Sequence, residues 1–201
     1  MTKASDPGVA GLLLAAGIGR RYDPSGSRLK LIEPAPCGRH AGAPIAVAAL
    51  RNLRAVVADV VAIVRTIDND AQRRLHELLA AEGTPLVICP DADQGMGRSL
   101  ACGVNARPDA AGWLVALADM PAVSPRTIAA VRDAIAGGCD AALPVFRGQR
   151  GHPVGFGRGC RDQLAALSGD VGARSVLERH SPRRIDVDDP GCLLDIDTPP
   201  R

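Results

Sequence analysis

Short apolar runs alternate with longer segments of helical spacing along the first two thirds of this chain. The strand-like runs cover residues 9–16, 60–65, 86–89 and 113–118. The segments with helical spacing cover residues 44–56, 69–82, 98–106 and 124–136. Strands that alternate with helices form parallel βαβ units with right-handed crossovers. The order therefore predicts a doubly wound α/β fold with a mostly parallel sheet.

Two of the expected helices carry boundary signals. Asp68 or Asn69 is suited to cap the start of the second helix, and Gly83 is suited to end it. Ser124 is suited to cap the fourth helix, with Pro125 in its first turn. These signals agree with the boundaries that the apolar spacing predicts.

The pattern loosens after residue 140. The elements expected there are strands at 141–146, 152–156, 184–187 and 192–196, and a short helix at 173–180. The chain shows no internal repeat and no low-complexity linker, and its 201 residues suit one compact domain over 1–201. We expect a monomer, because no heptad pattern or apolar stripe indicates assembly.

Composition narrows the classes of function. Hydrophobic residues make up 46% of the chain but aromatic residues only 2%, so the core must be built from Ala, Val, Leu and Ile. Lys and Arg total 24 against 22 for Asp and Glu, which gives a net charge of +2. A protein that coats nucleic acid normally carries a basic patch with stacking aromatics, so this class is not expected. The charge balance suits a small anionic ligand held by a few cations.

Neither a membrane segment nor an export signal is expected. No apolar stretch approaches the roughly 20 residues that span a bilayer, and the first residues show no signal-peptide pattern. The six cysteines contain no CxxC pair and are Cys37, Cys89, Cys102, Cys139, Cys160 and Cys192. We therefore expect a cytoplasmic protein with reduced thiols that fill the core, and no cysteine zinc site.

A glycine-containing loop follows the first strand. Its small residues can let the backbone approach a ligand at the carboxyl end of a strand, and exposed N–H groups can cradle anionic oxygens. An ordinary strand-to-loop turn is the alternative. No GxxxxGK[ST] phosphate loop occurs. Tyr22 stands where a dinucleotide-binding fingerprint needs a third small residue, and a turn at 23–27 follows instead of a helix.

Four cations lie in this loop or shortly after it, namely Arg20, Arg21, Arg28 and Lys30. Cations beside a glycine turn suit a triphosphate, because each can neutralise phosphate oxygens that the backbone alone leaves unsatisfied. The alternative is a solvated basic loop.

Aspartates follow two apolar strand-like runs. Asp119 comes directly after the run that ends at Ala118, and Asp195 and Asp197 stand at the end of the last run. Each aspartate alone could be a helix cap or a turn residue. Together at one sheet edge, beside a basic loop, they predict a Mg²⁺ site, since Mg²⁺ takes one or two carboxylates and substrate phosphates.

Six short motifs are spread along nearly the whole chain. They are Leu14-Ala15-Ala16-Gly17 with Arg21 and Lys30, Gly95-Met96-Gly97-Arg98-Ser99-Leu100, Asp119-Met120-Pro121, Gly151-His152-Pro153-Val154, Leu167-Ser168-Gly169-Asp170-Val171-Gly172-Ala173-Arg174, and Asp195-Ile196-Asp197-Thr198-Pro199. In this order they resemble the MobA-like nucleotidyltransferases, and within them the molybdenum cofactor cytidylyltransferases. Ala15-Ala16 resembles the cytidylyl branch, because the guanylyl branch usually carries Ala-Gly-Gly. Tyr22 stands where the family usually has Met, and the loop at 23–28 is longer than the usual few residues.

The resemblance implies a Rossmann-like fold of the nucleotide-diphospho-sugar transferase type. It implies a nucleotide-binding half over about 1–140 and an acceptor-side part over about 141–201. The residues that it assigns to the nucleotide are Leu14, Ala15, Ala16, Gly17, Gly19, Arg21, Lys30, Gly95 and Ser99. The residues that it assigns to Mg²⁺ are Asp119 and Asp197, and those on the acceptor side are His152, Asp170 and Arg174. Arg21, Lys30 and Asp119 are the expected catalytic residues.

The implied reaction transfers CMP from CTP to the phosphate of molybdopterin, with release of pyrophosphate. Transfer of this kind depends on positioning and charge neutralisation, so no nucleophilic side chain is required. His152 is expected to hydrogen-bond or support the site, because a phosphate nucleophile is already ionised near neutral pH. A molybdenum hydroxylase is the partner that the resemblance suggests.

Three other functions are open at this point. The enzyme could use another nucleoside triphosphate or another acceptor, such as a sugar phosphate. A nicotinamide-dependent oxidoreductase is disfavoured by Tyr22 and by the turn after it. A non-enzymatic carrier of the molybdenum cofactor is disfavoured by Asp119, Asp197 and Lys30, because a carrier needs no metal–triphosphate site.

Overall fold

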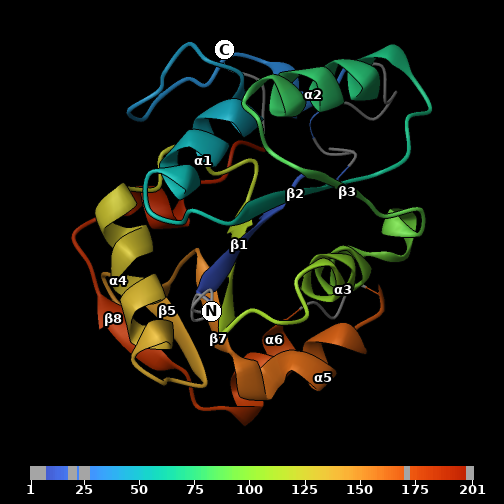
Figure 1. Ribbon diagram of the computed structural model, residues 1–201. Helices are drawn as coiled ribbons and strands as arrows, with labels where there is room; N and C mark the ends of the chain where they lie inside the picture. The colour runs from blue at the N-terminus through green and yellow to red at the C-terminus, as the bar shows by residue number, and fades with distance from the viewer. Residues whose placement is uncertain (1–7, 18–21, 23–27, 170–172, 198–201) are drawn as a thin grey trace, which may run out of the picture.

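An eight-stranded sheet runs through the part of the protein that the computed structural model describes, residues 8–17, 22, 28–169 and 173–197 (Figure 1). The strands are β1 (Val9–Leu14), β2 (Val60–Val64), β3 (Leu86–Ile88), β4 (Gly112–Leu117), β5 (Ala141–Phe146), β6 (Gln149–Arg150), β7 (Val154–Gly157) and β8 (Arg183–Asp186). Their order is β3-β2-β1-β4-β7-β5-β6, and β8 pairs with β5. Strands β3, β2, β1 and β4 are parallel, whereas β7 is antiparallel to β4 and to β5. The expected α/β fold with a mostly parallel sheet is confirmed.

Helices cover both faces of the sheet. They are α1 (Ile45–Arg54), α2 (Asp70–Ala81), α3 (Met96–Ala106), α4 (Pro125–Ala136), α5 (Arg161–Ala165) and α6 (Arg174–Arg179). Figure 1 shows α1, α2 and α4 on one side of the strands and α3, α5 and α6 on the other. Short 3₁₀ helices are η1 (Lys30–Ile32), η2 (Ala92–Gln94), η3 (Arg158–Cys160) and η5 (Pro190–Leu193).

The core consists of two apolar clusters separated by the sheet. Alternate residues of a strand point to opposite faces, so Leu13 of β1 packs in the cluster with α1, α2 and α4. Its neighbour Leu12 packs in the cluster with α3, α5 and α6. Aliphatic side chains dominate both clusters, and Trp113 and Phe156 are the two large aromatics that are fully buried.

The expected helix starts are confirmed at two positions. The Asn69 side chain accepts a hydrogen bond of 2.9 Å from Gln72 N at the start of α2. The Ser124 side chain accepts one of 3.2 Å from Arg126 N at the start of α4. Helix α3 begins earlier than expected, at Met96, directly after Gly95. No helix in the described part of the chain is long and apolar enough to cross a membrane.

Two expectations were wrong. The run at 192–196 is not a strand, because Pro190 opens the 3₁₀ helix η5 and the chain then continues without regular structure. The six thiols are not all reduced, because Cys89 and Cys102 form a disulfide. The end of β3 lies against α3, which brings these two residues to a Cα–Cα distance of 6.0 Å. The other four cysteines are free.

Candidate functional site

Lys30 and two aspartates from distant parts of the chain form an ion-pair cluster. Lys30 Nζ donates hydrogen bonds to Asp119 Oδ2 at 2.7 Å and to Asp197 Oδ1 at 3.0 Å. The Lys30 side chain is only 10% exposed, whereas those of Asp119 and Asp197 are 24% and 34% exposed. The cluster therefore holds a buried ammonium between two carboxylates that are partly open to solvent.

Backbone pairing at the carboxyl edge of the sheet brings the two carboxylates together. Asp119 lies two residues beyond β4, and Ala118 N donates to Leu14 O at the end of β1, at 3.1 Å. Ile196 N donates to Asp119 O at 3.0 Å, which places Asp197 beside Asp119. The expectation that both aspartates lie at one sheet edge is confirmed.

Charge in the cluster favours the ionised lysine. Burial opposes the charged form, but hydrogen bonds and negative charge from Asp119 and Asp197 outweigh it and raise the pKa of Lys30. Lys30 is therefore a cation at neutral pH. It can pair with phosphate oxygens when another cation takes its place on the carboxylates.

The two carboxylates have the donor chemistry that Mg²⁺ requires. Mg²⁺ binds through one or two protein carboxylates and completes its shell with water and phosphate oxygens. The described residues contain no group of three or more His, Cys, Asp or Glu that could hold a metal by itself. Asp119 and Asp197 would therefore need substrate phosphates to complete a metal site, and they could hold a metal only in place of their contacts with Lys30.

Asp189 fixes the C-terminal segment that carries Asp197. Its buried carboxylate accepts hydrogen bonds from Ser124 N at 2.9 Å, Thr127 Oγ1 at 2.6 Å and Gly191 N at 3.0 Å. The segment is thereby attached to the start of α4. Sequence analysis did not identify this residue, although Asp before Pro-Gly is a turn signal that could have drawn attention to it.

A cavity of about 790 Å³ opens at the same sheet edge. Leu14 at the end of β1 and Leu117 at the end of β4 contribute to its apolar lining. Arg150, His152 and Arg174 are polar residues around it. The cavity therefore combines an apolar surface with two cations and one carboxylate, Glu178, and its net positive charge suits a ligand with a ring system and an anionic group.

His152 lies half-buried beside this cavity. Its burial lowers the pKa of the imidazole, and the negative charges of Asp119 and Asp195 only partly oppose that shift. His152 N donates to Cys192 O at 2.9 Å, while the buried Nδ1 has no hydrogen-bond partner among the described residues. The neutral ring thus keeps one nitrogen for a ligand. This fits the expected hydrogen-bonding role, which stays a prediction.

The structure describes only one of the other two predicted acceptor-side residues. Arg174 lines the cavity from the start of α6 and forms an ion pair with Glu178 at 3.0 Å. Asp170 lies outside the described residues. Arg150, which sequence analysis did not select, lines the cavity one residue before Gly151 and has no ion-pair partner among the described residues. A cation next to the Gly-His-Pro-Val motif is the signal that could have identified it.

The predicted nucleotide segment Gly95–Ser99 forms the start of α3. Gly95 has a φ of +117°, in the left-handed region that favours glycine. A Cβ on Gly97 would lie 2.9 Å from Gly169 O and 3.2 Å from Ser168 O. Glycine is therefore required where α3 passes the segment 168–169, and Ser99 is buried in the following turn.

The described part of the first loop places small residues at the end of β1. Ala15 and Ala16 are buried and Gly17 is exposed, whereas predicted Gly19 and Arg21 lie outside the described residues. Arg28 is ion-paired with Glu33 at 2.9 Å and lies over the buried ring of Tyr22. Tyr22 thus packs inside the domain beneath a loop cation.

Comparison with known proteins identifies a family. A family model described as "MobA-like NTP transferase domain" matches residues 11–184. The purine catabolism protein PucB of Bacillus subtilis is 32% identical over 120 residues, which cover 57% of each chain. The matched region thus spans little more than half of that relative's length.

Solved structures show the same arrangement over nearly the whole length. Rv0371c of Mycobacterium tuberculosis has a TM-score of 0.78 and 28% identity, with 96% of this chain and 94% of that chain covered. A manganese complex of Rv0371c has a TM-score of 0.73 and 27% identity, with 95% and 94% covered.

Proposed function

The chain belongs to the MobA-like NTP transferase family and is a nucleotidyltransferase, and from this premise we propose that it transfers CMP from CTP to the phosphate of molybdopterin, releasing pyrophosphate. The observation that carries the proposal is the Lys30–Asp119–Asp197 cluster at the sheet edge where the cavity of about 790 Å³ opens. Two carboxylates and a nearby cation are the groups that a metal–triphosphate needs, and the cavity can take the acceptor.

The reaction is an in-line displacement at phosphorus. A phosphate oxygen of the acceptor forms a bond to the α-phosphorus of CTP, and the bond to the bridging oxygen breaks to release pyrophosphate. Mg²⁺ held by Asp119 and Asp197 supplies charge neutralisation when it is bound. The protein's own contribution is positioning and electrostatic stabilisation.

Lys30 neutralises the leaving group. Its ammonium is already desolvated and ionised in the cluster, and its raised pKa keeps it charged at neutral pH. When the triphosphate arrives, the side chain exchanges the carboxylates for oxygens of the β- and γ-phosphates. Arg21, which lies outside the described residues, is proposed to act on the same oxygens.

The acceptor lies in the cavity with its ring system on the apolar lining. Arg174 and Arg150 provide positive charge for its phosphate, and the neutral His152 provides a hydrogen bond. A proton acceptor is not required, because the phosphate is already ionised. In this proposal, residues 1–140 hold the nucleotide and also supply apolar lining for the cavity, and residues 141–201 supply the polar groups that face the acceptor.

The choice of CTP depends on Ala15-Ala16, which resembles the cytidylyl branch of the family. We propose that the protein works in the cytoplasm and that a molybdenum hydroxylase receives the product. PucB, the relative noted above, is named for purine catabolism.

Pyrophosphate release tests the proposal directly. The protein is incubated with Mg²⁺, molybdopterin and either CTP, GTP or ATP, beside an Asp119→Asn variant. Asp59→Asn is the matched control, because Asp59 forms an ion pair with Arg107 and is not part of the cluster. Release with CTP that is lost only in Asp119→Asn supports the proposal. Release with GTP alone contradicts the choice of base, and no release with any nucleotide contradicts the reaction.

A further inference from the structure

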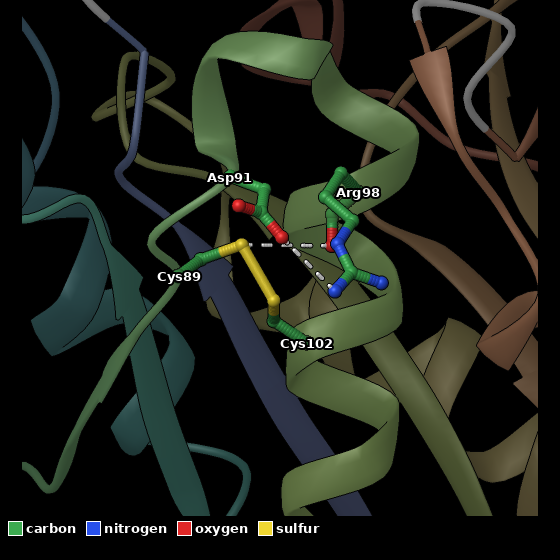
Figure 2. Close-up of a disulfide and its surroundings, with 4 residues drawn as sticks. All are labelled: Cys89, Asp91, Arg98 and Cys102. Atoms are coloured by element: carbon green, nitrogen blue, oxygen red, sulfur yellow. Dashed lines mark hydrogen bonds and ion pairs between the residues drawn. A yellow bond between two sulfur atoms is a disulfide. The ribbon is translucent and has the colours of Figure 1, made fainter.

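A disulfide joins the end of β3 to α3 and encloses the predicted nucleotide segment. Cys89 follows β3 directly, and its backbone N donates to Val64 O at 2.8 Å, which fixes it to the sheet. Cys102 lies 13 residues later in α3. Figure 2 shows the bridge beside the first turns of the helix. Gly95 and Ser99 lie in the loop that the bridge closes.

The Cys89 sulfur has a second possible partner at the same place. Cys89 Sγ lies 3.7 Å from the carbonyl oxygen of Arg98, within the nucleotide segment (Figure 2). A reduced thiol at this position can donate a weak hydrogen bond to that oxygen. Both redox forms of Cys89 therefore have a partner in α3, but only the disulfide is a covalent link.

An exposed ion pair also connects two parts of the enclosed loop. Arg98 forms an ion pair with Asp91 at 3.2 Å, and both side chains are more than one third exposed. An exposed ion pair contributes little to the free energy of folding. The disulfide is the covalent link between the end of β3 and α3, and it adds to the packing of Ser99 and Leu100 in the core.

We propose that Cys89 and Cys102 form a reversible redox site that controls nucleotide affinity, with the oxidised form binding the nucleoside triphosphate more tightly. The inference rests on the proposed role of Gly95–Ser99 in nucleotide binding. The disulfide restricts the conformations of the loop. Less conformational entropy is therefore lost when a ligand binds the ordered segment. Reduction removes that restraint, while buried Leu100 and Val104 still hold the later turns of α3 in the core.

The redox step is a thiol–disulfide exchange with a dithiol reductant. Cys102 is partly exposed and Cys89 is fully buried, so the thiolate of the reductant attacks Cys102 Sγ. The S–S bond breaks, and Cys89 leaves as a thiolate and takes up a proton. The second thiol of the reductant then displaces Cys102 as a free thiol. Two electrons pass to the protein, and the reductant leaves as a cyclic disulfide.

The test compares the oxidised protein, the same protein treated with dithiothreitol, and a Cys102→Ser variant. Mass spectrometry after alkylation first establishes the thiol count of each sample. Amide hydrogen exchange of peptides covering 90–101 then reports loop order without any nucleotide. Calorimetric titration with CTP and Mg²⁺ reports affinity. Cys139→Ser is the matched control, because Cys139 is one of the free cysteines and reduction does not change it.

We expect reduction and Cys102→Ser to speed exchange across 90–101 and to weaken CTP binding by about fivefold or more. Cys139→Ser should behave as the unaltered protein in both redox states. Equal exchange and equal affinity in the oxidised and reduced samples would overturn the redox inference. Faster exchange on reduction without CTP binding in either form would support control of the segment and contradict the proposed CTP specificity instead.

Discussion

Lys30 Nζ lies 2.7 Å from Asp119 Oδ2, so the predicted phosphate-binding cation is paired with a predicted metal ligand. Asp197 completes the cluster from the opposite end of the chain, at 3.0 Å from the same nitrogen. In the proposed reaction, a divalent cation would compete with this ammonium for the two carboxylates. Such competition would release Lys30 from the carboxylates, so that its ammonium could bind the triphosphate.

Replacing Lys30 by methionine should lower the stability of the protein and raise its affinity for a metal ion. Without the ammonium, Asp119 and Asp197 repel one another, so we expect a loss of roughly 1–3 kcal/mol in the free energy of unfolding without metal. The same change removes a competitor, so Mn²⁺ should bind the variant more tightly than the unaltered protein. Urea denaturation and Mn²⁺ titration by electron paramagnetic resonance measure the two quantities.

Lys30→Arg is the companion variant, because it keeps the positive charge. It should retain most of the stability and show no gain in Mn²⁺ affinity. Weaker Mn²⁺ binding in Lys30→Met than in the unaltered protein would show that the lysine does not compete with the metal. Pyrophosphate release by Lys30→Met should fall by roughly 100-fold, because an electrostatic contact in the transition state is lost.

Asp189→Ala should destabilise the protein and weaken metal binding together. The change leaves Ser124 N, Thr127 Oγ1 and Gly191 N without their acceptor, and unsatisfied buried donors cost roughly 1–3 kcal/mol each where water cannot replace the partner. We expect a total loss of about 2–4 kcal/mol in the free energy of unfolding. Urea denaturation measures it.

Asp188→Ala is the matched control for this prediction, because Asp188 is the exposed neighbour of Asp189. It should change the free energy of unfolding by less than about 0.5 kcal/mol. Similar losses in both variants would show that the three hydrogen bonds do not anchor the C-terminal segment.

The sequence predicted much of the fold because local signals and tertiary packing agree there. The side chains of Asn69 and Ser124 cap the helices at which they were placed, and the apolar runs became parallel strands. The proximity of Asp119 and Asp197 at one edge of the sheet was also predictable, because both follow strand-like runs. That prediction of position was right although the second run is not a strand, since Ile196 N pairs with Asp119 O.

Features that depend on distant contacts could not be predicted. The disulfide needs Cys89 and Cys102 to face one another, and their spacing of 13 residues matches no local motif. Asp189 acts through donors more than 60 residues earlier in the chain. The direct pairing of Lys30 with both aspartates could not be predicted either, because it joins residues that are 89 and 167 positions apart in the chain.

The stability of the protein should fall above pH 9 through Cys160. Burial, followed by the negative charge of Asp140, raises the pKa of its thiol to about 11. The unfolded chain releases this proton near pH 9, so ionisation favours unfolding between about pH 9 and pH 11. The stabilisation is complete below pH 9 and is lost as the pH rises through about 11, by about 2–3 kcal/mol at most.

The measurement compares urea denaturation of the unaltered protein and Cys160→Ala from pH 8 to pH 11. Cys160→Ala loses packing at every pH, but the difference in stability between the two proteins should shrink as the pH rises. A difference that stays constant with pH would contradict the role assigned to the thiol. Other titrating groups, such as Lys30, affect both proteins alike and cancel in the difference.

Gly97→Ala should weaken nucleotide binding, because its effect on the structure is concentrated at the start of α3. The added Cβ would lie 2.9 Å from Gly169 O and 3.2 Å from Ser168 O, and backbone atoms cannot move away without shifting α3 or the segment 168–169. Overpacking of this kind costs about 1–3 kcal/mol. We expect CTP affinity to fall at least tenfold in calorimetric titration. Asn105→Ala, on the exposed side of α3, is the control and should leave affinity unchanged. Equal affinity in Gly97→Ala and the unaltered protein would mean that the start of α3 does not contact the nucleotide.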